Sequence, residues 1–182
     1  MPSIPFVRKR PAGPNPWIIF GSTEAAYARW VSHVCAMACC RSLILASRGE
    51  APTLWELTKR GIELGVYRET SGGISGAFHD PLAELLREFG IGAERFGHIA
   101  EPELRRLAGR YPIMLSVDLA KVCSTDAGSH LVLIACRTAA AYQVLDNACI
   151  LNISGIAWLE HKELCRISNG KGLIIKRMPH SR

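Results

Sequence analysis

Apolar positions along the chain follow a helical spacing up to about residue 110 and a strand-like spacing beyond it. In the first part they recur every three or four residues, as they do on one face of an amphipathic helix. In the second part they form short continuous runs separated by turn residues. Helices followed by neighbouring strands predict an α+β domain.

Five helices are predicted from this spacing and from the residues that start and stop helices. The expected ranges are 25–30, 35–48, 53–61, 81–89 and 101–108. Thr53 and Glu56 have the spacing of a capping box, and Asp80 is expected to be the N-cap of the helix that follows it. The apolar run 17–20 fits a strand or a docking segment, and the Ser- and Gly-rich run 71–76 fits a connector or the lining of a substrate cleft.

Four strands are predicted in the second part of the chain, at residues 112–117, 129–135, 141–145 and 172–177. The turns at 137–138 and 146–147 are short. Because short turns join antiparallel neighbours, the sheet is expected to be mostly antiparallel.

The composition is that of a globular protein, since 48% of the 182 residues are hydrophobic and 21% are charged. Residues 1–16 are rich in proline and basic residues and are expected to form an extended arm, whereas residues 17–182 are expected to form one domain. The basic start leads into prolines and not into an apolar segment, so no signal peptide is expected. No run reaches the roughly 18 apolar residues of a membrane helix, so no membrane partner is expected either.

The net charge of +6 is spread along the chain, with one dense basic cluster at residues 8–10. No basic stripe interleaved with aromatic residues is present, so nucleic acid is not an expected partner, whereas an acidic protein or peptide would suit the charge. The seven cysteines are an odd number at irregular spacing. Because no export signal precedes them, they are interpreted as reduced thiols in the cytoplasm.

Cys35 is the first candidate for chemistry because it lies where a polar segment passes into the predicted helix 35–48. Unpaired N–H groups and the dipole at a helix N-terminus favour the thiolate, which is the nucleophile. Cys39 is expected in the core, and Cys40 is the alternative nucleophile if the helix is shifted by a turn. A metal site built from His33 and these cysteines would lack a Cys-x-x-Cys pair, so neither a metal nor a cofactor is predicted.

His130 opens one predicted strand and Asp146 ends the next. If the two strands pair, both side chains lie at one end of the sheet, against which the Cys35 helix would pack. Thiol catalysis needs a base that takes the thiol proton and a third group that holds the base in the right tautomer. Asp118 and Asp126 are alternatives for that third group. Four further histidines are expected on loops or at the surface: His79, His98, His161 and His180.

Three motifs resemble, in this order, those of the C39-like cysteine peptidases, which have a papain-like fold. Cys35-Ala-Met-Ala-Cys39 resembles the family's Cys-Gly-Pro-Ala-(Cys/Ser). Gly128-Ser-His130, followed by apolar residues, resembles the start of its Gly-His strand, and Val144-Leu-Asp-Asn147 resembles its apolar-Asp-Pro turn. The resemblance covers roughly residues 27–177.

The resemblance implies a papain-like fold, with an N-terminal helical half that carries the Cys35 helix and a C-terminal antiparallel sheet. It implies that Cys35 is the nucleophile, His130 the general base and acid, and Asp146 the residue that orients the imidazole. The backbone N–H of Cys35 would supply half of the oxyanion hole.

The chain departs from the family pattern around the thiol. The family's second oxyanion donor is a glutamine six residues before the cysteine, where this chain has Arg29. Arginine donates hydrogen bonds but is longer and fully charged. Ser32 and His33 are the other candidate donors. The residues after Cys35 are Ala-Met in place of Gly-Pro, and Asn147 replaces a proline.

These observations lead to three functional hypotheses. The first is hydrolysis of a peptide, such as a leader peptide, through an acyl-cysteine intermediate. The second is acyl transfer to an amine, from an amide or thioester carried by a peptide or a carrier protein. The third is a catalytically degenerate domain that binds a peptide in its cleft.

Overall fold

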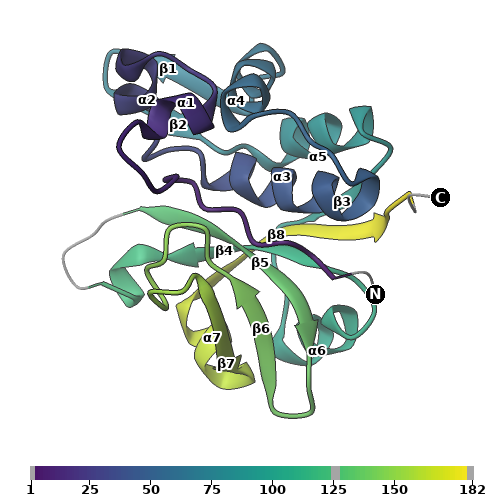
Figure 1. Cartoon of the computed structure of the whole chain (residues 1–182). Coiled ribbons are helices and arrows are strands. Elements are labelled where there is room, and N and C mark those ends of the chain that lie inside the picture. Colours follow the sequence, from purple (N-terminus) through teal and green to yellow (C-terminus); the bar gives the residue numbers. More distant parts are fainter. Residues whose placement is uncertain (1–2, 124–127, 180–182) are drawn as a thin grey trace.

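The computed structural model describes residues 3–123 and 128–179, so that Asp126 and His180 lie outside the described residues. It consists of a helical half and a half built on an antiparallel sheet (Figure 1). The order of helices first and sheet second is the predicted one, and the α+β fold class is confirmed.

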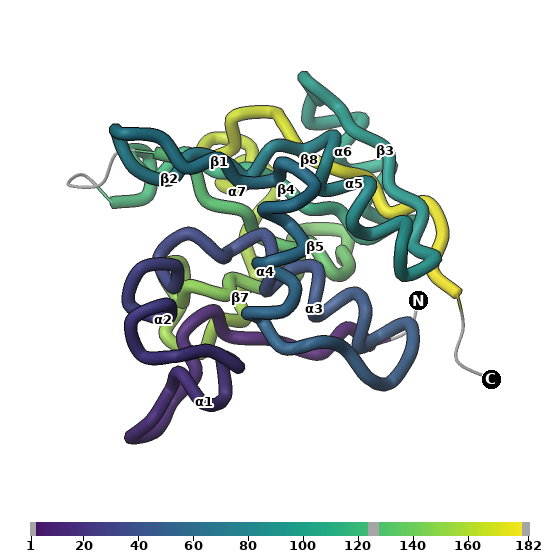
Figure 2. The backbone as a smooth tube through the Cα atoms, turned by 90° about the horizontal axis from the view of Figure 1, so that it is seen from above, coloured from purple at the N-terminus to yellow at the C-terminus, as the bar shows by residue number. Residues whose placement is uncertain are grey.

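Five helices and a two-stranded hairpin make up the helical half. The helices are α1 (Pro16–Phe20), α2 (Glu24–Trp30), α3 (Cys35–Arg48), α4 (Leu54–Glu63) and α5 (His79–Glu88). The hairpin pairs β1 (Tyr67–Thr70) with β2 (Gly73–Gly76). Seen from above, α1 and α2 lie at one end of α3, and α5 lies towards the other end (Figure 2).

The second half is a six-stranded sheet in the order β3-β8-β4-β5-β6-β7, with every neighbouring pair antiparallel. Its strands are β3 (Gly92–Phe96), β4 (Ile113–Asp118), β5 (Ser129–Arg137), β6 (Ala141–Leu145), β7 (Ile156–Glu160) and β8 (Ser168–Arg177). Three helical segments accompany it: α6 (Glu101–Ala108), η1 (Leu119–Lys121) and α7 (His161–Ile167).

The sheet separates two hydrophobic cores. One face of the sheet packs against α3, whose Met37, Leu43 and Ile44 are fully buried. The opposite face packs against α6 and α7 through Leu104 and Leu164. Since α3 is buried along most of its length, its N-terminus is held in a fixed position beside the sheet.

The predicted ranges of five helices and four strands are confirmed to within a few residues, but several local predictions are wrong. Residues 17–20 lie in helix α1, which ends at Gly21 in a left-handed conformation. Asp80 is not the N-cap of α5, because the helix already begins at His79. The run 71–76 is not a plain connector but forms the turn and second strand of a hairpin, and its Ser75 and Gly76 line a pocket, in agreement with the other expectation for this run. His161 is buried against Tyr142, with ring centroids 4.4 Å apart.

Residues 3–15 contain no helix or strand, and they run between the helical half and the sheet (Figure 1). Val7 is buried, and the Phe6 ring packs so closely on Gly155 that a Cβ there would lie 2.0 Å from it. The N–H of Lys9 donates to the carbonyl of Asn147 at 2.9 Å. These contacts place the segment directly beside the loop that follows β6.

No single helix among the described residues is long and apolar enough to span a membrane. The pair α2 and α3 passes the same test of length and composition only when joined across a 104° bend.

Candidate active site

Cys35 is the first residue of α3 and is partly buried. The preceding residue, Val34, provides no side-chain cap, so the N–H groups of the first turn have no acceptor within the helix. Ala36, Met37 and Ala38 are completely buried and hold this end of the helix in place. The thiol therefore lies at the positive end of a 14-residue helix.

His130 and Asp146 lie side by side at the end of the sheet, as the strand pattern predicted. β5 and β6 are antiparallel neighbours, and the imidazole Nε2 lies 2.8 Å from the Asp146 Oδ1. Both side chains are buried, with 3% of His130 and 0% of Asp146 exposed. Asp146 is itself held by N–H groups of Ala148, at 3.0 Å, and Leu151, at 2.6 Å. With Nε2 bound to the carboxylate, Nδ1 is the ring nitrogen left for the thiol.

The thiol of Cys35 is shifted towards its ionised form. Burial alone raises its pKa, but the hydrogen bond and charge of His130, the N–H of Leu131 and the charge of Lys9 outweigh this, and the pKa is below that of an ordinary thiol. Ionised thiol is the nucleophilic species.

His130 is shifted in the complementary direction. Burial lowers its pKa, but Asp146 and Cys35 together raise it to about 9. Burial raises the pKa of Asp146, while hydrogen bonds from His130 and Leu151 bring it below that of an ordinary carboxyl group. The three groups together favour a thiolate, an imidazolium and a carboxylate near neutral pH.

The alternative residues from the sequence are differently placed. Cys40 is fully buried, and burial raises its pKa far above that of an ordinary thiol, as it also does for Cys39. Asp118 accepts the N–H of Ala120 and caps η1. Among the described residues, no group of three or more His, Cys, Asp or Glu side chains could hold a metal ion.

The three candidate oxyanion residues lie close in sequence to Cys35, but their contacts and charges differ. The guanidinium of Arg29 is exposed and paired with Glu69 of β1. The carbonyl of Ser32 accepts a hydrogen bond from the Lys9 ammonium at 3.3 Å. Burial and the charge of Lys9 lower the pKa of His33, which favours a neutral imidazole. The N–H of Cys35 itself, in the first turn of α3, remains a candidate donor for an oxyanion.

Lys9 is a component of the site that the sequence did not reveal. It is anchored at both ends, because its N–H donates to Asn147 and its ammonium donates to Ser32. Its positive charge acts on both Cys35 and Asp146. The only sequence signal was the basic cluster 8–10, which does not indicate where the arm lies.

We expect Lys9→Met to raise the pKa of Cys35, because it removes a cation that favours the thiolate. At pH 6–7 the rate of Cys35 alkylation by iodoacetamide should fall about two- to threefold, consistent with a secondary charge effect. Arg10→Met is the matched control, since Arg10 is exposed on the same arm. An equal rate in Lys9→Met and the native protein would contradict this role.

Asn147 connects the helix that carries the thiol to the sheet. Its Nδ2 lies 3.0 Å from the carbonyl of Cys35, 3.2 Å from the Cys39 sulfur and 3.2 Å from the carbonyl of Leu131. The side chain is only 4% exposed. The residue that departs from the family's proline thus fixes α3 against β5.

Asn147→Ala should lower the free energy of unfolding by about 1–3 kcal/mol, because it leaves buried carbonyls without a donor. Urea denaturation followed by circular dichroism measures this change. Asn152→Ala is the control, because Asn152 is exposed and, among the described residues, its side chain bonds only to Ser154. Equal stability of the two variants would show that the Asn147 contacts contribute nothing to the fold.

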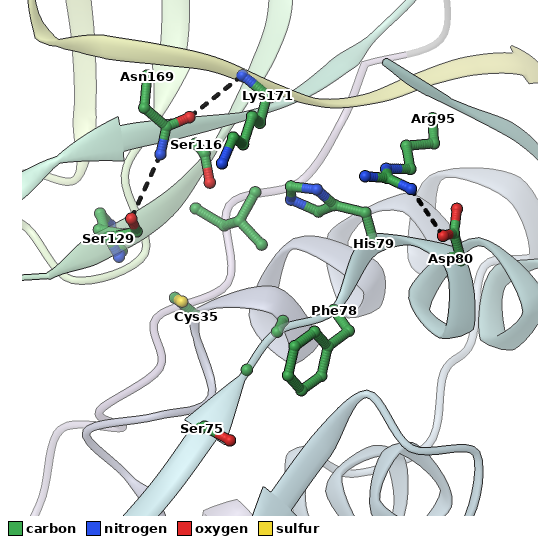
Figure 3. Close-up of a pocket in the computed structure, with 14 residues that line it drawn as sticks. Cys35, Ser75, Phe78, His79, Asp80, Arg95, Ser116, Ser129, Asn169 and Lys171 are labelled. Atoms are coloured by element: carbon green, nitrogen blue, oxygen red, sulfur yellow. Dashed lines mark hydrogen bonds and ion pairs between the residues drawn. The ribbon is translucent and has the colours of Figure 1, made fainter. Parts of the chain in front are cut away.

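A pocket of about 540 Å³ opens beside the thiol. Cys35 and His130 are among the residues that line it. The segment from Ser75 to Asp80 also lines it, and Figure 3 shows Cys35 with Ser75, Phe78, His79 and Asp80 of that segment. The remaining wall comes from β3, β4, β5 and β8. The pocket therefore lies between the two halves of the molecule and gives a substrate access to the sulfur.

Comparison with solved structures identifies the fold. A C39-like peptidase from Bacillus anthracis is 12% identical, covers 96% of each chain and has a TM-score of 0.57. A double glycine motif protease from an AMS/PCAT transporter, in complex with its leader peptide, is 16% identical, with 77% of this chain and 81% of that chain covered and a TM-score of 0.54. The peptidase domain of Streptococcus ComA is 10% identical, with 80% and 93% covered and a TM-score of 0.53.

No protein-family model matches the chain, and neither does the sequence of any curated protein. The likeness is therefore one of structure at low sequence identity. The chain has the papain-like fold of C39 peptidase domains, as its three sequence motifs predicted.

Proposed function

We propose that this protein is a thiol peptidase that cleaves a peptide through an acyl-cysteine intermediate. The observation that carries the proposal is the buried contact between His130 and Asp146 beside a thiol whose pKa is lowered. In this mechanism Cys35 attacks the carbonyl carbon of the scissile bond, and the His130 imidazolium gives its proton to the leaving amine. Neutral His130 then takes a proton from water, which hydrolyses the thioester and releases Cys35.

The N-terminus of α3 would stabilise the negative oxygen that forms when Cys35 attacks. The N–H of Cys35 is one donor, and an unpaired N–H in the first turn acts together with the helix dipole. Arg29 would have to leave Glu69 before it could serve as the second donor, whereas Ser32 and His33 are nearer to Cys35 in the chain.

An extended peptide is the substrate that fits the pocket wall. β2 pairs with β1 along one edge, and Ser75 and Gly76 of β2 line the pocket. A peptide can add to such a strand edge by main-chain hydrogen bonds. One structural neighbour is bound to a leader peptide, which supports a peptide substrate for this chain as well.

We further propose that residues 17–182 form the catalytic domain and that residues 1–16 are an arm lying against it. None of the seven cysteines is in a disulfide. Free thiols suit the reducing conditions of the cytoplasm, which is the compartment we propose. Neither a metal nor a cofactor takes part in the proposed mechanism.

Mass spectrometry can test the acyl-cysteine step directly. The native protein is mixed with a peptide library, quenched in acid within seconds and digested, and an acyl adduct is expected on Cys35 alone. Cys35→Ala should form no adduct and no cleavage products, while Cys123→Ala, which changes a thiol far along the chain, should behave like the native protein. Absence of both adduct and products from the native protein would contradict the proposal in favour of a peptide-binding domain.

The same reaction separates hydrolysis from acyl transfer. With an added primary amine such as glycine amide, a peptidase gives the free acid as the main product. A predominance of the amide at millimolar amine would instead identify an acyltransferase.

A further inference from the structure

The pocket beside Cys35 has an excess of positive charge. Lys171, Arg95 and His79 project towards its interior from β8, β3 and the start of α5 (Figure 3). The guanidinium of Arg68 does not line the pocket but lies 4.7 Å from the centre of the ring of Phe78, which does. Two permanently charged side chains, Lys171 and Arg95, and the imidazole of His79 therefore line one cavity.

Negative charge in the pocket is limited and already engaged. Asp80 is the one carboxylate among the described residues that line it, and it binds Arg95 at 2.8 Å. Lys171 has no carboxylate within ion-pair distance in the described part of the chain. Lys171 is therefore the cation left to meet a substrate.

The groups around Lys171 suit a polar ligand. The Ser116 side chain comes from β4, and Asn169 donates to the Ser129 hydroxyl at 3.3 Å and accepts the N–H of Lys171 at 3.1 Å. Burial, together with the charges of Arg95 and Lys171, lowers the pKa of His79, so that a neutral imidazole faces the pocket near pH 7. A neutral imidazole and a hydroxyl can both donate hydrogen bonds to a carboxylate oxygen.

We infer that this pocket binds an acidic side chain of the substrate peptide, with Lys171 as the residue that determines the specificity. This inference rests on the proposed function and adds a substrate class to it: peptides that carry Asp or Glu near the scissile bond. The carboxylate would pair with the ammonium inside a cleft that also contains the thiol, so that binding of the acid places the peptide across Cys35.

A randomised octapeptide library tests the inference, with cleavage sites read by mass spectrometry on both sides of the broken bond. The native protein should enrich Asp and Glu at one position by about fivefold, the factor expected for one partly exposed ion pair. The enrichment should disappear in Lys171→Met and change to Lys or Arg in Lys171→Glu. Lys176→Met is the matched control, because Lys176 lies on the same strand and pairs with Glu94.

Cleavage without acidic enrichment would overturn the inference and leave the proposed function intact, whereas absence of cleavage together with absence of an acyl adduct would overturn both. A second measurement needs no substrate. The ratio of the alkylation rates of Cys35 by iodoacetate and by iodoacetamide should fall at least about threefold in Lys171→Glu, since only the first reagent is an anion. An unchanged ratio would also overturn the inference.

Discussion

Replacement of His130 by alanine is expected to slow alkylation of Cys35 by iodoacetamide about 10- to 100-fold at pH 6. An unperturbed thiol has a pKa of about 8.5, so only about 0.3% of it is ionised at that pH. The hydrogen bond and charge of His130 lower the pKa of Cys35, whereas burial acts in the opposite direction. Part of the gain from ionisation is offset because a less basic thiolate is a weaker nucleophile. Peptide cleavage should fall further, by at least about 1,000-fold, since the general acid and base is lost as well.

Site-resolved mass spectrometry of labelled peptides measures the alkylation, with the other six cysteines as internal references. His98→Ala is the control variant, because His98 lies away from the thiol, beside Gly170. In the native protein the rate at Cys35 should rise less steeply between pH 6 and pH 8 than the rates at ordinary thiols, which should rise about tenfold per pH unit. If Cys35 is labelled at the same rate with and without His130, the two residues do not form a thiolate–imidazolium pair, and the prediction is wrong.

The elements that the sequence predicted are those with a strong pattern. α3, α4, α5 and α6 have apolar residues at helical spacing, and the capping box at Thr53 is present. β3 and β7 lacked such a pattern. In β3 the polar Glu94 and Arg95 occupy the middle of the strand, and in β7 the outward-facing Trp158 is apolar, so neither strand alternates cleanly. α1 resembled a strand because its five residues are mostly β-branched or aromatic.

The candidate site was predictable where a reactive residue lies at the end of an element. Cys35, His130 and Asp146 each lie at a boundary in the apolar pattern, and the antiparallel order of the strands brings the last two together. Lys9 and Asn147 depend on contacts between segments more than 100 residues apart, for which local pattern gives no signal. The pairing of Arg29 with Glu69 likewise depends on how α2 packs beside the β1 hairpin.

Asp146 offers a sharper test than simple removal of a proposed catalytic residue, because its two oxygens have different partners. Oδ1 lies against Nε2 of His130 and also accepts the N–H of Ala148, while Oδ2 accepts the N–H of Leu151. In Asp146→Asn, the amide oxygen can take the Oδ1 position, which places the NH2 group at the Oδ2 position. The NH2 group then faces one other donor, the N–H of Leu151. In the flipped amide the NH2 group would instead take the Oδ1 position and face two donors, Nε2 of His130 and the N–H of Ala148. We therefore expect the unflipped amide, which keeps the imidazole in the tautomer that leaves Nδ1 free to take the thiol proton.

Peptide cleavage should consequently fall only about tenfold in Asp146→Asn, where orientation is kept and charge is lost, but about 10,000-fold in Asp146→Ala, where both are lost. Removal of the charge also lowers the pKa of His130 from about 9, so the alkaline fall of kcat/KM should move to lower pH in Asp146→Asn. The unpaired N–H of Leu151 should reduce the free energy of unfolding of that variant by about 1–3 kcal/mol. Equal losses of activity in the two variants, both measured on folded protein, would mean that the carboxylate acts through its charge and not by orienting the imidazole.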